Sequence, residues 1–160
     1  MGIEEWSQGQ LVVIDPPKYA KMLFKKMEYF GAFTVLHALI EFWMQNLYEL
    51  TLIHKIGPLR AYEEHVAKAR YRYRLLVGDL LKAKLIGKGE AKRIEDFGLL
   101  RDRIAHRLVK YSYQTYPWHL VGKAEVVHVF EEGLALVDLL SARCNNKTSM
   151  TFPLRPSRKS

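Results

Sequence analysis

Residues 97–108 read FGLLRDRIAHRL, and this stretch is the most informative one for the fold and the function of the chain. Its apolar residues recur at helical spacing, so it predicts an α-helix. Asp102 and His106 are four residues apart, which places them on one face of that helix, one turn from each other. A carboxylate there can accept a hydrogen bond from an imidazole nitrogen and so fix which nitrogen is free for chemistry. Arg101 adds a permanent cation whose planar donor fork suits a phosphate group.

A cation, an imidazole and an orienting carboxylate are sufficient to break an RNA backbone without a metal ion. In this interpretation His106 is the general base or acid, Arg101 stabilises charge on the phosphoryl oxygens, and Asp102 orients His106. The competing interpretation is structural. Arg101, Asp102, Arg103 and Arg107 would then form a solvated charged face, with His106 an ordinary surface or core histidine.

The pattern of an arginine, a polar residue, three further residues and a histidine resembles the signature of the HEPN superfamily, named for higher eukaryotes and prokaryotes nucleotide-binding. Residues 104–105 match the expected apolar or small fillers, and residues 99–100 match the apolar lead-in. Asp102 stands where the family usually has asparagine. The resemblance is strongest over residues 75–140.

The resemblance implies an all-α domain, a metal-independent endoribonuclease, and a homodimer in which two copies of the motif line one cleft. It also implies a toxin or defence protein, with an antitoxin protein as a further partner. One HEPN toxin group has a tyrosine two residues after the histidine, which a partner nucleotidyltransferase modifies. Leu108 occupies that place here, so the sequence does not predict this kind of neutralisation.

Composition limits the remaining function classes. The 160 residues are enough for one domain with a real core, and 49% of them are hydrophobic. The net charge of +8 favours anionic partners, RNA first and anionic membrane surfaces second. The single cysteine, Cys144, predicts a reducing compartment, and no ligand spacing predicts a metal or other cofactor. We expect a cytoplasmic protein, because we find neither a secretory signal nor an apolar run long enough to span a membrane.

Turn and cap signals divide the chain into helices. Asp15 followed by two prolines predicts a helix start, and the Gly57-Pro58 pair and the glycines of residues 87–89 predict turns. The predicted helices cover approximately residues 17–30, 32–55, 59–85, 90–110 and 118–143. We therefore predict an all-α, up-and-down bundle of about four to five helices. Residues 1–16 would be an extended arm, 17–145 the single HEPN-like domain, and 146–160 a basic tail.

Two further sets of residues are candidates for the site. The predicted RNA-binding side chains are basic or aromatic and lie near the motif or on the helix before it: Arg70, Arg74, Arg103, Arg107, Tyr111 and Tyr113. A polar stripe follows the most apolar helix at four-residue steps: His37, Glu41, Gln45 and Glu49. A solvated face is the simpler interpretation of this stripe, and a cleft lining is the alternative.

Two other functions remain open at this stage. The first is a HEPN-like bundle without catalysis that binds nucleic acid or serves as a regulatory module. The second is an oligomeric helical protein that acts through a protein partner, with its basic charge serving only solubility. The accessibility of Arg101 and His106 distinguishes these functions from catalysis.

Overall fold

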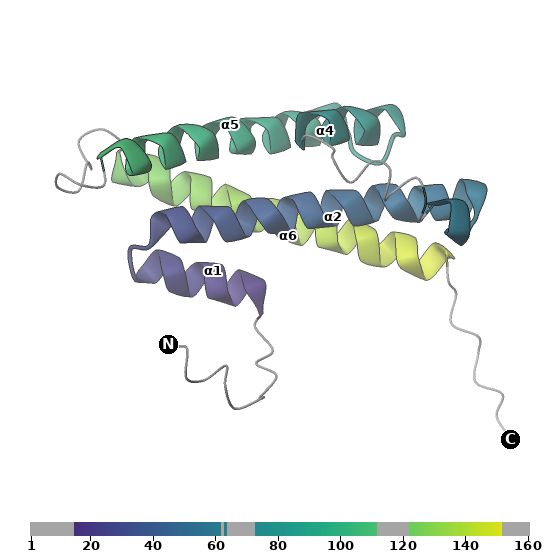
Figure 1. Ribbon diagram of the computed structural model, residues 1–160, viewed down its shortest axis with the longest axis horizontal. Coiled ribbons are helices and arrows are strands. Elements are labelled where there is room, and N and C mark those ends of the chain that lie inside the picture. The colour runs from purple at the N-terminus through teal and green to yellow at the C-terminus, as the bar shows by residue number, and fades with distance from the viewer. Residues whose placement is uncertain (1–14, 62, 64–72, 112–121, 152–160) are drawn as a thin grey trace, which may run out of the picture.

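The computed structural model shows an all-α bundle in the part of the chain that it describes, residues 15–61, 63, 73–111 and 122–151. Its helices are α1 (Pro16–Lys25), α2 (Tyr29–Ile56), α4 (Tyr73–Lys82), α5 (Lys88–Tyr111) and α6 (Lys123–Thr151). Figure 1 shows α2 running through the middle of the bundle, with α1 on one side and α4 and α5 on the other. The colour gradient shows that α5 runs opposite to both α2 and α6. The predicted all-α bundle is confirmed.

The first turn of the bundle lies between α1 and α2. Asp15 caps α1 by accepting a hydrogen bond from the backbone N–H of Lys18 at 3.3 Å. The helix ends at Lys25, and Met27 adopts a left-handed conformation with φ of 64°. The predicted break at Gly31 is therefore wrong by a few residues. Gly31 lies inside α2, where a Cβ atom would come within 3.3 Å of Leu23.

The core forms around one stripe of α2. Residues at intervals of three and four positions are fully or almost fully buried: Phe33, Leu36, Ile40, Met44 and Leu47. α6 packs on this stripe with Leu136, Val137 and Leu140. The remaining apolar surface of α2 is covered only in part by α1, because Phe30 and Phe42 are each 52% exposed.

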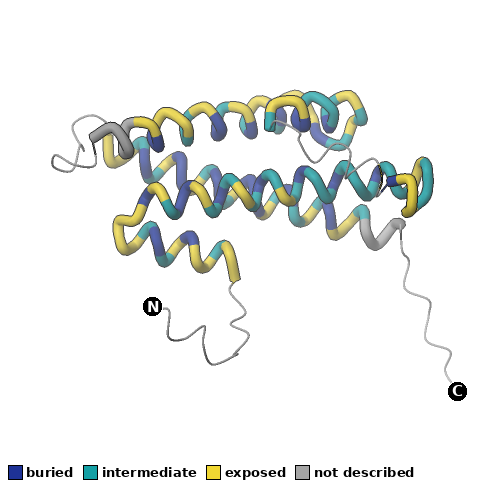
Figure 2. Tube along the Cα trace, viewed as in Figure 1, coloured by how far each residue is buried: buried dark blue, intermediate teal, exposed yellow. Residues whose placement is uncertain are grey.

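The inner face of α5 completes the core. Ile94, Phe97 and Ile104 are buried, and Figure 2 shows that the opposite side of α5 is exposed. Ion pairs fix α5 against α6, since Arg93 Nε lies 2.6 Å from Glu132 Oε1 and Arg103 pairs with Glu125. The motif helix therefore buries one apolar face against the bundle.

Two further helix ends differ from the sequence prediction. The last helix continues to Thr151, so residues 146–151 of the expected tail are helical. Just before this extension, Cys144 is buried and donates a hydrogen bond to the backbone carbonyl of Trp43 at 3.3 Å. The expected third helix ends at Lys82 rather than Leu85, because Lys84 turns the chain with φ of 57°.

Candidate functional site

The motif residues lie on α5 in different surroundings. His106 is exposed. The Arg101 side chain is only 23% exposed, and its Nη1 atom lies 3.0 Å from Oδ1 of Asp102, whose own side chain is 66% exposed. Arg101 therefore points along the bundle side of α5, while Asp102 and His106 face solvent.

Asp102 does not make the contact that the sequence predicted for it. Its carboxylate is paired with Arg101, and the structure gives it no hydrogen bond to His106 among the described residues. One turn of helix brings both side chains to the same surface, as their spacing requires. The observed partner of the Asp102 carboxylate is therefore Arg101 and not His106.

A second histidine, His37 of α2, lies in this region. Its ring stacks on that of Tyr73 of α4, with centroids 4.7 Å apart and planes 19° from parallel. Burial, and after it the positive charge of Arg101, lower the pKa of His37 to about 4 against an opposing effect of Asp102. His37 is therefore a neutral imidazole at physiological pH.

Tyr73 is fixed against α5 at two points. Its hydroxyl donates a hydrogen bond of 3.0 Å to the backbone carbonyl of Ile94. One turn later, a Cβ atom on Gly98 would lie 3.1 Å from Cε1 of the ring, so glycine permits the close approach. Burial raises the pKa of Tyr73, which keeps the phenol protonated and able to donate.

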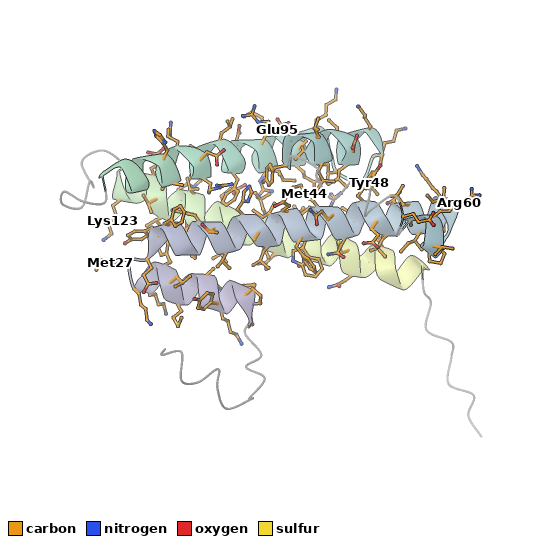
Figure 3. The ribbon with its side chains drawn as sticks, viewed as in Figure 1. Met27, Met44, Tyr48, Arg60, Glu95 and Lys123 are labelled. Atoms are coloured by element: carbon orange, nitrogen blue, oxygen red, sulfur yellow. The ribbon has the colours of Figure 1, made fainter. Side chains whose placement is uncertain are left out.

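The guanidinium of Arg101 is incompletely partnered. Its Nε atom is buried and has no hydrogen-bond partner, and it is the one such side-chain nitrogen or oxygen atom in the described part of the chain. The charges of Arg101, Glu41, Glu95 and Asp102 all act on Tyr73, so one cation shares the region with several carboxylates. A buried donor without a partner is rare in folded proteins and often marks a functional site. Figure 3 shows side chains filling the space between α2 and α5.

Sequence reasoning missed His37 and Tyr73 as members of this site. The polar stripe on α2 is not a solvated face, because His37, Glu41, Gln45 and Glu49 are all half-buried. At His37 the stripe packs against another helix, because the imidazole stacks on the ring of Tyr73. The four-residue polar spacing on an otherwise apolar helix was the signal that could have found it.

The predicted RNA-binding residues are only partly described. Arg74 is exposed on α4, and Arg103 pairs with Glu125 of α6. Arg107 and Tyr111 belong to α5, but their side chains lie outside the described part of the structure. Arg70 and Tyr113 also lie outside the described residues.

The described residues contain no group of three or more histidine, cysteine, aspartate or glutamate side chains that could hold a metal ion. No helix among them is both long enough and apolar enough to cross a membrane. A pocket of about 320 Å³ opens between α5 and α6, on the other side of α5 from Tyr73. It is lined by Arg93, Asp96, Phe97, Leu100, His128, Val129 and Glu132.

No protein-family model, curated protein or solved structure matches the chain. The resemblance to the HEPN superfamily therefore rests on the motif of α5 and on the all-helical architecture around it.

Proposed function

We propose that the protein is a metal-independent endoribonuclease of the HEPN type. The observation that carries the proposal is the placement of Arg101 and His106 on one helix, five residues apart, with His106 exposed and the arginine paired with Asp102. An exposed imidazole can exchange protons with a bound substrate, and a fixed guanidinium can stabilise developing negative charge. The net charge of +8 supports binding of an RNA backbone.

The proposed reaction is an internal transesterification. His106 accepts the proton of a ribose 2′-hydroxyl, and the 2′-oxygen attacks the adjacent phosphorus. The bond from phosphorus to the 5′-oxygen of the next nucleotide breaks, and that oxygen takes a proton from a protonated imidazole. The products are a 2′,3′-cyclic phosphate and a free 5′-hydroxyl. Arg101 stabilises the phosphoryl oxygens while charge accumulates on them.

This reaction needs one base and one acid. His37 is unsuited to the acid role, because burial lowers its pKa to about 4 and leaves it without a proton to give near neutral pH. A second copy of the chain would supply a second His106. The proposal therefore includes a homodimer in which the two α5 helices approach each other. A toxin or defence role, a cytoplasmic location and an antitoxin partner belong to the same proposal.

Cleavage of RNA in excess EDTA is the direct test. His106→Ala and Arg101→Ala should each lower cleavage about a hundredfold or more while the far-UV circular dichroism spectrum stays unchanged. His54→Ala is the matched control, because His54 is exposed at the far end of α2 and should retain full activity. Undiminished cleavage by the His106 variant would rule out the assignment.

A non-catalytic module that binds nucleic acid is the second candidate. It is favoured by one observation, the low exposure of Arg101 and the burial of its Nε atom, which restrict direct access of a phosphate to the guanidinium. In that case the wild-type protein would bind RNA but would not cleave it. Salt-dependent binding without products in the EDTA assay would select this function.

A further inference from the structure

Tyr73, on which the ring of His37 stacks, contacts the motif helix along one face. Tyr73 donates a hydrogen bond to the carbonyl of Ile94 and abuts Gly98, and the charge of Arg101 acts on both rings. Residues 94, 98 and 101 share one face of α5, because they are four and three positions apart. The two rings come from α2 and α4, so their stack joins these two helices, and Tyr73 joins them to α5 on the face that Arg101 shares.

We propose that His37 and Tyr73 are positioning residues for Arg101, and that their stacked pair holds the guanidinium in place before any anion binds. The Arg101 Nε atom is buried on the bundle side, where the charge of Arg101 acts on both rings, while Nη1 pairs with Asp102 at the solvent edge. The identification of the anion as an RNA phosphate rests on the proposed function. The fixing of the guanidinium does not.

Physical chemistry favours this arrangement for an arginine that must act on a phosphate. A guanidinium is planar and stacks on flat rings, and its long side chain loses conformational freedom when it binds a ligand. If the folded protein already holds the guanidinium in place, the conformational entropy of its side chain is lost during folding and not during binding. The neutral state of His37 matters as well, since a protonated ring would set a second cation beside Arg101. Arg101 and Asp102 of α5 act on His37, Tyr73 of α4 stacks on it, and Glu41 lies four residues further along its own helix.

The first experiment measures hydrogen exchange of arginine Nε–H groups by NMR in the full chain. The Arg101 signal is assigned by its loss in Arg101→Gln. In the wild type it should exchange at least about tenfold more slowly than that of exposed Arg74, because the Arg101 Nε atom is buried. His37→Ala should bring the two rates together, and the control Gln45→Ala, two turns further along the same stripe, should not.

Gly98→Ala provides a milder perturbation should His37→Ala fail to fold. The added methyl would lie 3.1 Å from Cε1 of Tyr73 and would displace the ring without removing a polar group. Arg101 exchange should become several-fold faster in this variant. If His37→Ala folds and its Arg101 Nε–H group exchanges as slowly as in the wild type, the proposal is overturned. If His37→Ala does not fold, the same result in Gly98→Ala overturns it.

The second experiment measures steady-state cleavage of RNA in EDTA. His37→Ala and Gly98→Ala should lower kcat about tenfold and change KM less than about twofold, because a displaced arginine loses contacts that matter in the transition state. If the wild type cleaves RNA and both variants keep its kcat, the positioning role is overturned. A wild type that never cleaves RNA would refute the proposed function, and the exchange experiment would still decide whether the stack holds Arg101.

Discussion

Gly133→Ala in α6 should destabilise the protein, although alanine is the better helix former. A Cβ atom at this position would lie 2.6 Å from Cε2 of Phe97 and 2.8 Å from Cδ1 of Leu36. Both neighbours are fully buried, so neither can move into solvent. Since these distances are shorter than van der Waals contact allows, α6 must separate from α2 and α5, or the two side chains must leave their preferred rotamers.

The expected magnitude follows from two opposing effects. Replacing glycine by alanine inside a helix gains up to about 1 kcal/mol. Overpacking a closed core costs about 1–3 kcal/mol, and two close contacts place this site towards the upper end. We expect a net loss of about 1–2 kcal/mol in the free energy of unfolding.

Gly78→Ala in α4 is the matched control. No heavy atom lies within 4 Å of the position that its Cβ would occupy, so only the helix effect remains. This variant should gain about 0.5–1 kcal/mol. Urea denaturation followed by circular dichroism gives both values. A Gly133→Ala protein as stable as the wild type would show that α6 does not pack on α2 and α5 as closely as described.

Three other predictions concern the site. Between pH 6.5 and about 4, His37 binds a proton in the unfolded chain but not in the folded protein, so the free energy of unfolding should fall as the pH is lowered through this range. The substitution His37→Phe should make this fall smaller, as measured by urea denaturation at both ends of the range. RNA affinity should weaken steeply with salt, and Arg74→Glu should reduce the slope if α4 contacts the backbone; affinity that does not change with salt would exclude phosphate contacts. Light scattering should give twice the monomer mass of 18.7 kDa, and a monomer at micromolar concentration would remove the second His106 from the proposed reaction.

The inward faces of the helices could be predicted from the sequence, because core burial follows helical periodicity directly. Ile94, Phe97 and Ile104 of α5 are examples, and the same periodicity selects the buried stripe of α2. Helix ends were predicted less well. α6 continues through polar residues up to Thr151, and the burial of Cys144 against α2 near the start of this stretch is information that local propensity does not contain.

The candidate site divides in the same way. Arg101, Asp102 and His106 are close in sequence, so a spacing argument brings them together. His37 and Tyr73 reach the same region from α2 and α4, far away along the chain. Only the tertiary structure joins them. Gly98 lies within the motif helix, but the sequence does not predict that the Tyr73 ring packs against it.

The regular apolar core of the bundle is interrupted by a polar region around Arg101, where α2, α4 and α5 place charged and titratable side chains. Burial of a cation is costly unless it is paired and hydrogen-bonded, and here Nε has no partner while Nη1 has Asp102. A sequence under selection for stability alone would replace this arginine by an apolar residue of similar size. Under the proposed function, this charge serves to bind an RNA phosphate, and, together with burial, it also lowers the pKa of His37. An anion that reaches the solvent edge of the guanidinium would relieve part of this cost, and His106 stands exposed on the same helix to act on it.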